Sequence, residues 1–227
     1  MKNYYASSAA SATAPSARRE RLKAMPRAAR FRSPWSLKAR IGMFLWRLAW
    51  ALLCRPTPKP LYRWRNAVLS TFGASVSGAP FVAASATIQI PWHVELEDRA
   101  CVGDKVVLYS LGRIALRRRC TVAQESYLCA GTHDFSDPQL PLVTGEIVIG
   151  EEAFVGARAF IHPGVHIGAG AVIGACSVVT KDVSEWTVAA GNPCAPIRQR
   201  SYRMAQGASR GESGPPAQGG ARSAKAP

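Results

Sequence analysis

Aliphatic residues recur at every sixth position through the second half of the chain. A small or short residue follows each of them four positions later, and glycine often stands directly after the aliphatic residue. One inward side chain per short strand, with a small residue at each corner, predicts triangular coils of about eighteen residues stacked into a parallel β-helix. An amphipathic helix would instead need apolar residues three and four apart. The six aliphatic positions are Ile149, Val155, Ile161, Ile167, Ile173 and Val179, and the short residues are Ala153, Ala159, Val165, Ala171, Ser177 and Val183.

The same period continues upstream in three runs, each displaced by two residues from the next. A displacement of two is expected where a corner carries two additional residues. Counted from Val76 to Ser184 without one insertion, the pattern predicts about five coils. The runs are Val76, Val82 and Ile88; Ile90, Leu96, Val102, Leu108 and Ile114; and Leu116, Val122 and Leu128.

The insertion lies at about residues 129–146, where the six-residue period fails. It is polar, contains proline and is too long for a coil corner, and long loops on a rigid scaffold tend to carry function. His133 stands within Gly-Thr-His-Asp, where a neutral imidazole would suit a general base near neutral pH. The alternative is a surface histidine without a role.

A helical segment is predicted at residues 33–72, ahead of the coils. Ser33-Pro34 is a helix start and Arg55-Pro56 a stop, and the apolar run between them is shorter than the roughly twenty residues that span a bilayer. A second short helix is predicted at about 61–69. The residues that share one face of the first helix are Leu37, Ile41, Phe44, Leu45, Leu48 and Leu52, with Trp46 and Trp50 on a neighbouring face.

Two interpretations of the first helix remain open. It could lie in a membrane interface, with its tryptophans at headgroup depth and its arginines toward anionic lipid. It could instead cap the first coil and bury the same aliphatic face there, since a β-helix needs a covered end. The two are not exclusive.

Charge is distributed unevenly along the 227 residues. Residues 1–65 carry +14, residues 66–200 carry −2 and residues 201–227 carry +3. The core is therefore nearly neutral, without the basic face that nucleic-acid binding needs. Residues 1–32 are expected to be a disordered basic extension rather than a signal peptide, because they lack an apolar core segment, and residues 201–227 a disordered tail.

The cysteines and the other histidines indicate neither disulfides nor a metal. The six cysteines form no C-x-x-C pair, which fits small buried thiols in a reducing cytoplasm. Cys129 lies four residues before His133, too far along a strand for a Cys-His nucleophile unless the loop folds back. His162 and His166 resemble half of a metal site without a third ligand, so no metal is expected, and His93 is interpreted as structural.

Cations gather at the end of the period. Lys181, Arg198 and Arg200 are the best placed to meet phosphates along the last coils. The run Arg117 to Arg119 is interpreted as a solvated corner rather than a specific anion site. The turn Gly191-Asn192-Pro193 is expected to close the last coil and to begin a short C-terminal helix.

Four motifs together resemble those of the hexapeptide-repeat O-acetyltransferases, which include galactoside, maltose and nodulation acetyltransferases and exopolysaccharide enzymes. The branch of the colanic acid biosynthesis acetyltransferases is similar also in residues 55–66 and in Ser136-Asp137-Pro138. The resemblance covers about residues 33–200. The motifs are Gly131-Thr132-His133-Asp134, the repeat from Ile149, Val178-Val179-Thr180-Lys181-Asp182 and Gly191-Asn192-Pro193.

The resemblance implies a homotrimer of left-handed β-helices, with acetyl-CoA as co-substrate in a groove between two subunits. His133 would be the general base, and Asp134 and Asp137 would contact the acceptor. Ala157 and Ala175 would line the pantetheine arm. The residues facing the nucleotide and its phosphates would be Thr180, Lys181 and Arg198. Because Ala195 stands where the family often has a basic residue, phosphate affinity is expected to rest more on Arg198 and Arg200.

The expected protein is thus an all-β left-handed β-helix at 73–200 with an N-terminal helical segment and a short C-terminal helix. We expect a cytoplasmic acetyl-CoA-dependent O-acetyltransferase acting on a sugar of an exopolysaccharide or a lipid-linked saccharide. Its cationic front end would place it peripherally at the inner membrane face, and no nucleic-acid partner is expected. The alternatives are a catalytically inactive β-helix scaffold in a polysaccharide assembly complex and a metal-dependent hydratase on the same fold.

Overall fold

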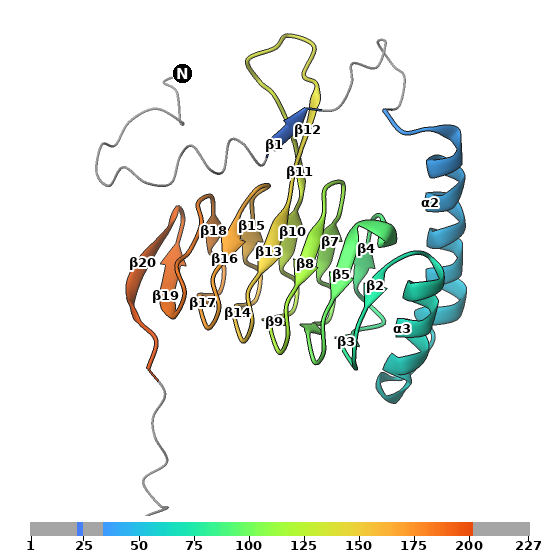
Figure 1. The fold of residues 1–227 in the computed structure, drawn as a ribbon, viewed down its shortest axis with the longest axis horizontal. Coiled ribbons are helices and arrows are strands. Elements are labelled where there is room, and N and C mark those ends of the chain that lie inside the picture. Colours follow the sequence, from blue (N-terminus) through green and yellow to red (C-terminus); the bar gives the residue numbers. More distant parts are fainter. Residues whose placement is uncertain (1–21, 25–33, 202–227) are drawn as a thin grey trace, which may run out of the picture.

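The computed structural model describes residues 22–24 and 34–201, and they form a left-handed parallel β-helix, as predicted (Figure 1). Each coil gives one short strand to each of three parallel sheets. Five coils are complete, and a sixth begins with the bridge from Ile167 to Val183 and continues into β19 (Thr187–Gly191). The first sheet holds β2 (Ser75–Val76), β5 (Val94–Leu96), β8 (Ile114–Leu116), β13 (Ile147–Ile149) and β16 (His166–Ile167).

The other two sheets follow in chain order around each coil. The second contains β3 (Phe81–Val82), β6 (Cys101–Val102), β9 (Thr121–Val122), β14 (Phe154–Val155), β17 (Val172–Ile173), β19 and β20 (Cys194–Gln199). The third contains β4 (Thr87–Ile88), β7 (Val107–Tyr109), β10 (Tyr127–Cys129), β15 (Phe160–Ile161) and β18 (Val178–Val179).

The aliphatic period forms the core. Val155 pairs with Val122 on one side and with Ile173 on the other, so equivalent side chains stack from coil to coil. All six aliphatic residues of the second half and all six short residues that follow them are buried. The interpretation of the period is therefore confirmed residue by residue.

Several coil corners share one backbone conformation. At these corners the third residue after an inward aliphatic has a left-handed φ, for example 56° at Arg119 and 56° at Glu152. Side chains other than glycine and asparagine rarely adopt this region. The amide of Arg119 donates to Asp98 O at 3.0 Å and that of Glu152 to Arg118 O at 3.0 Å, so bonds between coils hold the corner.

The arginine run at one corner is paired with carboxylates of neighbouring coils. Arg117 Nη1 lies 2.7 Å from Glu97 Oε1, and Arg119 Nη1 lies 3.0 Å from Glu152 Oε1. Arg118 pairs with Glu151. These partly exposed pairs contribute little stability individually, but they occupy the cations, and the run is a surface ion-pair ladder rather than an anion site.

Two helices and short helical turns cover the first coil (Figure 1). Ser36 caps the first helix, since its Oγ accepts from the amide of Ala39 at 3.2 Å. The predicted helical segment is confirmed, including the second helix. The elements are α2 (Leu37–Ala49), the π-helical turn η1 (Trp50–Cys54), the 3₁₀ turn η2 (Lys59–Leu61) and α3 (Tyr62–Thr71), with a further 3₁₀ turn, η3 (Pro91–His93), inside the coils.

The tryptophan face of α2 and η1 is the face that packs on the first coil. Trp46 and Trp50 are 1% and 5% exposed. Their indole nitrogens donate to Ile88 O at 2.7 Å and to Ala86 O at 2.9 Å. The capping interpretation is correct for this face, and two expectations were wrong: the tryptophans do not lie at a lipid headgroup, and the aliphatic face is not the buried one.

Arg65 of α3 anchors the cap to the same coil. It is fully buried, and its Nε donates to Val82 O at 2.8 Å while Nη1 reaches Pro58 O at 3.0 Å. Carbonyl oxygens thus satisfy a charge that would be costly to bury alone. Among the helices that the structure describes, none is long and apolar enough to cross a membrane.

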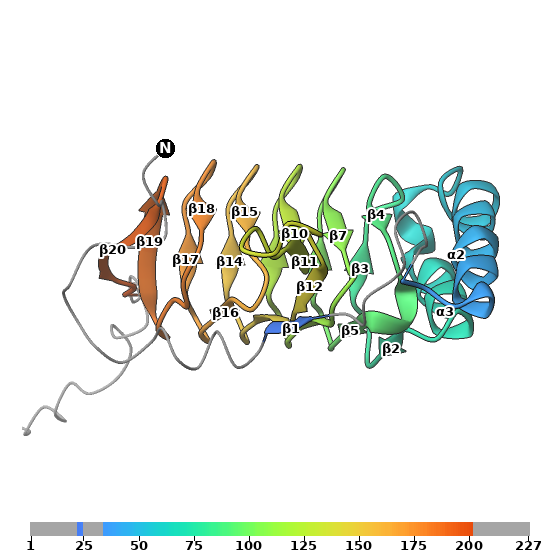
Figure 2. The same cartoon turned by 90° about the horizontal axis from the view of Figure 1, so that it is seen from above.

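The expected C-terminal helix is wrong, and a β-hairpin takes its place. The chain reverses at Asn192-Pro193, and β20 pairs antiparallel with β19. The last coil otherwise ends in a row of unpaired backbone groups, which β20 covers. Figure 2 shows this hairpin at one end of the stack and α2 and α3 at the other.

One short strand lies inside the expected N-terminal extension. Leu22–Ala24 form β1, which pairs antiparallel with β12 (Leu142–Gly145), so these three residues differ from the predicted disorder. The free edge of β12 supplies the backbone groups for this pairing. The rest of the predicted extension and the tail from residue 202 lie outside the described residues, and so does the helix start at Ser33.

Candidate active site

The predicted loop is a β-hairpin that leaves the stack between the third and fourth coils. β11 (Gly131–His133) pairs antiparallel with β12, with His133 opposite Leu142, and β1 extends the hairpin to three strands (Figure 1). A Cβ at Gly131 would lie 2.8 Å from Leu111 Cδ1, and one at Gly145 would lie 2.5 Å from Gly164 N. The backbone contact leaves no room for a side chain at Gly145, whereas at Gly131 the Leu111 side chain would have to move.

His133 is the last residue of β11, and its ring is fixed by one backbone carbonyl. Its Nδ1 lies 2.6 Å from Leu140 O, across the turn of the hairpin. A carbonyl oxygen can only accept, so Nδ1 must carry the proton of this bond. In the neutral ring the lone pair is then on Nε2. The arrangement leaves Nε2 as a proton acceptor, which a general base requires.

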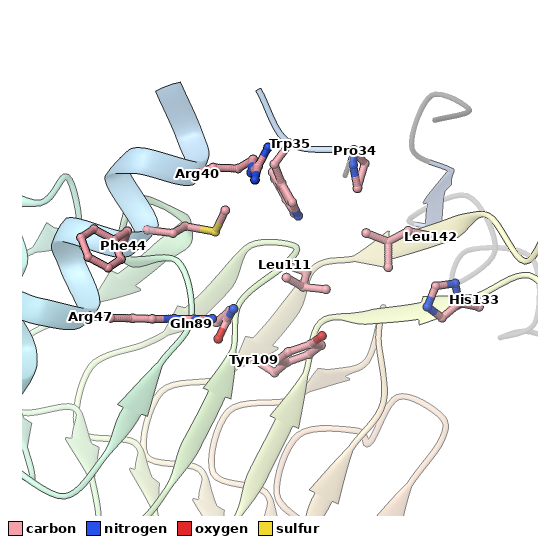
Figure 3. A pocket seen from close by; sticks show the side chains of 11 residues that line it. Pro34, Trp35, Arg40, Phe44, Arg47, Gln89, Tyr109, Leu111, His133 and Leu142 are labelled. Atoms are coloured by element: carbon pink, nitrogen blue, oxygen red, sulfur yellow. The ribbon is translucent and has the colours of Figure 1, made fainter. Parts of the chain in front are cut away.

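A cavity of about 510 Å³ lies between the hairpin and α2. Figure 3 shows His133 on one side, Arg40, Phe44 and Arg47 of α2 on the other, and Trp35 and Tyr109 between them. Aromatic faces, guanidinium groups and an amide suit a polyhydroxylated ligand that carries an anionic group. The lining residues are Pro34, Trp35, Arg40, Met43, Phe44, Arg47, Gln89, Tyr109, Leu111, His133 and Leu142.

The two aspartates predicted to contact the acceptor both take part in turns of the hairpin loop. Asp134 Oδ1 accepts from Ser136 N at 2.9 Å and from Ser136 Oγ at 2.5 Å. These bonds lower the pKa of Asp134 below its ordinary value. Asp137 Oδ1 accepts from Gln139 N at 2.9 Å. Neither aspartate is among the residues that line the cavity.

Cys129 does not have the environment of an activated nucleophile. Its thiol is half buried and donates to Gly131 O at 3.1 Å. Burial raises the pKa of the Cys129 thiol, which keeps it neutral at physiological pH. The structure thus favours His133 over the Cys-His alternative.

The residues expected to hold coenzyme A lie at different corners of one chain. Ala157 and Ala175 occupy the same corner of adjacent coils, where Ala157 O accepts from Cys176 N at 2.8 Å. Thr180 and Lys181 follow β18 at the next corner. Arg198 is exposed on β20, opposite Val188. One chain therefore brings the two alanines together but not all five residues.

Arg200 braces the last coils rather than facing an open groove. Its Nη1 donates to Glu152 O at 3.0 Å and to Gly170 O at 2.8 Å, and its guanidinium carbon lies 5.9 Å from the ring centre of Trp186. The expectation that it shares in phosphate binding does not fit these contacts. Lys181 and Arg198 are the exposed cations at this end of the described chain that were predicted to meet phosphate.

The other histidines have structural surroundings. His93 Nδ1 lies 2.9 Å from Ser110 O, as expected of a structural residue. His162 packs on Phe160 with ring centres 5.2 Å apart, and the amide of His166 donates to Asp182 Oδ1 at 2.8 Å. Within residues 22–24 and 34–201, no group of three or more His, Cys, Asp or Glu side chains is arranged to hold a metal.

Sequence reasoning missed most of the cavity wall. Trp35 precedes α2, Arg40 and Arg47 lie on it, and Gln89 and Tyr109 stand at the ends of two coils. No sequence spacing connects these segments with His133. The sequence contained only a weak sign of the cavity wall: Tyr109 is a large outward residue one position after the inward Leu108.

Comparisons with known proteins agree with the fold and motifs. The protein family described as "bacterial transferase hexapeptide (six repeats)" matches residues 146–181. The protein WcaF of Escherichia coli strain K12, whose name assigns it to colanic acid biosynthesis as an acetyltransferase, is 40% identical over 160 residues, which are 70% of this chain and 88% of WcaF.

Solved structures share the fold at lower identity. A maltose O-acetyltransferase from Clostridium difficile 630 is 22% identical with a TM-score of 0.62, over 74% of this chain and 90% of that one. A hexapeptide-repeat acetyltransferase of Vibrio cholerae O1 biovar eltor, complexed with acetyl coenzyme A, is 18% identical with a TM-score of 0.68, over 75% and 93%. The similarity to WcaF over most of both chains shows that this chain belongs to the family of hexapeptide-repeat acetyltransferases.

Proposed function

We propose that the protein transfers the acetyl group of acetyl-CoA to a hydroxyl of a saccharide, with His133 as the general base. The observation that carries the proposal is the bond from His133 Nδ1 to Leu140 O, which turns Nε2 into a proton acceptor at the wall of a cavity. A fixed tautomer of this kind is how a loop histidine becomes a usable base.

The transfer follows from this geometry in two proton steps. His133 Nε2 removes the proton of the acceptor hydroxyl as its oxygen attacks the acetyl carbonyl carbon. The tetrahedral intermediate then expels the CoA sulfur, and the imidazolium returns its proton to the thiolate. The products are an acetyl ester and free CoA, and His133 is neutral again. Backbone amides are the donors we expect for the oxyanion.

The placement of the residues expected to contact coenzyme A supports a homotrimer with shared sites. Ala157 and Ala175 form a small-residue corner with room for a pantetheine arm, whereas Thr180, Lys181 and Arg198 lie elsewhere on the same chain. In the proposed homotrimer, two neighbouring chains together contribute these five residues to one coenzyme. Two exposed cations that meet its phosphates from the last coils fit the chemistry of the nucleotide end.

For the acceptor, the cavity supports a saccharide that is part of an exopolysaccharide or is lipid-linked. The relative WcaF is assigned by its name to colanic acid biosynthesis, and a structural neighbour is a maltose O-acetyltransferase. Trp35 and Tyr109 offer faces for a sugar ring, and Arg40 and Arg47 offer donors for an anionic group. Asp134 and Asp137 each accept a loop amide with Oδ1, so we propose that they shape the loop that meets the acceptor.

We further propose that the enzyme works in the cytoplasm, peripherally at the inner membrane face. The support is the charge of +14 on residues 1–65, which anionic lipids would attract. Fractionation of cells that express the wild type or Lys38→Glu/Arg55→Glu, which lowers this charge and leaves the buried face of α2 and η1 in place, tests this placement. Equal membrane recovery of both would contradict it.

The decisive experiment follows thiol release from acetyl-CoA by purified protein with a panel of saccharides and lipid-linked sugar extract. Acceptor-dependent release that is lost in His133→Ala, while calorimetry still detects CoA binding, is the expected result. Equal release by both proteins would remove His133 from the mechanism. Absence of both release and CoA binding would favour a scaffold instead.

A further inference from the structure

The outward side of α2 and η1 carries a continuous row of large apolar side chains. Leu37 is 69% exposed, Phe44 66% and Leu48 48%. At about 1.5 Å per residue, the row from Leu37 to Leu52 is about 22 Å long. We call this row the outward face; its members are Leu37, Ile41, Phe44, Leu45, Leu48 and Leu52.

The same helix is apolar on its opposite side as well. Trp46, Trp50 and Cys54 are buried against the first coil and account for the capping function. A surface helix with one buried stripe normally presents polar residues on the other side, and a helix apolar on both sides is normally covered on both. The outward face therefore calls for a partner that the cap does not supply.

The charge around the outward face has one sign. Between residues 34 and 94 the chain contains no Asp or Glu, and the next acid along the chain is Glu95. The basic side chains are exposed, except for Arg65, which is buried in the cap. The surface that surrounds the apolar row therefore complements an anionic partner. The exposed cations of α2 and of the residue that ends η1 are Lys38, Arg40, Arg47 and Arg55.

A second copy of the chain is a poor candidate for this partner. Two outward faces in contact would bring like charges together, because neither carries an acid. Many carboxylates of the coils are already paired within their own chain, as in Arg117 with Glu97 and Arg119 with Glu152. The remaining occupant with an apolar interior and an anionic rim is a phospholipid bilayer.

We propose that the outward face of α2 and η1 docks on an anionic bilayer, with its aliphatic side chains at the acyl boundary and its cations at the phosphates. An interfacial helix needs this combination of an apolar face and flanking Lys and Arg. The docking element is thus the aliphatic row, and not the tryptophans, which face the other way.

Docking in this orientation fixes how the acceptor cavity lies relative to the lipid surface. Arg40, Met43, Phe44 and Arg47 belong to α2 and also line the cavity that contains His133 (Figure 3). The mouth of the cavity then lies beside the lipid surface, with two guanidinium groups at the level of the headgroups. This consequence for the acceptor rests on the proposed acetyl transfer, whereas the docking itself does not.

Flotation of the full chain with vesicles tests the proposal. The vesicles are phosphatidylcholine alone or with about 30 mol% phosphatidylglycerol, a charge density typical of anionic leaflets. We expect the wild type to float with the anionic vesicles only. The variant Ile41→Ser/Leu48→Ser removes two outward side chains that do not line the cavity, and its partitioning should fall by about tenfold or more.

The matched control is Ile197→Ser, an exposed aliphatic on β20 at the other end of the molecule. It should float like the wild type, which excludes a general effect of surface polarity. Lys38→Glu/Arg55→Glu should weaken binding to anionic vesicles and lower its salt dependence. The basic residues before α2 are present in every variant, so a difference in flotation between variants reports on α2 and η1.

Three outcomes would overturn the proposal. The double serine variant could float as well as the wild type, the wild type could bind neutral vesicles equally, or sedimentation could show that the variant dissociates an oligomer. Acetyl transfer to a water-soluble saccharide is expected to be the same in wild type and variant. If the double serine variant lost both acetyl transfer and flotation, the outward face would be assigned to folding. If the wild type bound vesicles but transferred no acetyl group, the result would count against the proposed function alone.

Discussion

Ile161 and His133 belong to neighbouring parts of one stack and are held by opposite means. Ile161 is fully buried between Leu128 and Val179 of the adjacent coils. His133 is exposed on a hairpin and is fixed by a single bond to Leu140 O. The coils gain their stability from repeated apolar burial, whereas the hairpin gains its geometry from a few hydrogen bonds. A change in the coils should therefore cost folding, and a change in the hairpin should cost catalysis.

The largest expected effect concerns the hairpin, where a change should cost catalysis. His133→Ala should lower kcat by about 10²- to 10⁴-fold, the typical contribution of a positioned base. The melting temperature should stay close to that of the wild type, because the side chain is exposed. Steady-state kinetics and calorimetry on the same preparation measure both quantities. A large loss of stability would break the comparison.

The second prediction tests the coils. Ile161→Ala should reduce the free energy of unfolding by about 2–5 kcal/mol, through lost burial and the cavity that remains. Activity per folded molecule should change little, since Ile161 does not line the cavity. Chemical denaturation followed by circular dichroism gives the stability. A loss below about 1 kcal/mol would mean that the coils relax to fill the gap.

The third prediction concerns the cap. Trp46→Phe removes the indole N–H that donates to Ile88 O and leaves this buried carbonyl without that donor. The cost should be about 1–3 kcal/mol. The matched control is Leu45→Ala, next to it on the exposed side, which should stay within about 0.5 kcal/mol. Equal effects of the two changes would contradict the assignment of the packed face.

The fourth prediction links β1 to the hairpin. Lys23 lies opposite Thr144 of β12, and Lys23→Pro should disturb this pairing because proline lacks the amide donor and restricts the backbone. We expect a loss in kcat of about a few-fold, as positioned groups are sensitive to small displacements. Lys23→Ala, which keeps the backbone, should behave as the wild type. An unchanged kcat in the proline variant would separate β1 from the site.

The smallest effect concerns pH. Hydrogen bonds from Ser136 lower the pKa of Asp134, so this group stabilises the loop above the ordinary aspartate pKa and loses that contribution as pH falls through its depressed value. Ser136→Ala should raise the pKa of Asp134 toward its ordinary value. Titration followed by NMR of the carboxyl carbon would detect the shift. An unchanged pKa would mean that the bond from the Ser136 hydroxyl is not its cause, since the backbone amide bond remains in this variant.

Much of the fold could be predicted because the repeat is local. In the second half of the chain, each inward aliphatic and the short residue after it appear in the sequence at the positions where the structure buries them. The end of the repeat was harder. Gly191-Asn192-Pro193 was interpreted as the beginning of a helix, but the open edge of the last coil pairs with the residues that follow. Edge pairing depends on what lies beside the strand, which the local sequence does not contain.

The candidate site divides in the same way. The broken period and the single histidine within it located the insertion and His133 from the sequence alone, whereas the structure showed that the insertion is a hairpin. The sequence also supplied both apolar faces of α2, but the tertiary structure decided that Trp46 and Trp50 pack inward and that the aliphatic row stays outside. The cavity wall was decided there too, because Trp35, Arg40 and Tyr109 meet His133 only through the folding of distant segments. Periodicity specifies which side chains are buried along a strand, whereas packing between elements specifies which surfaces face each other.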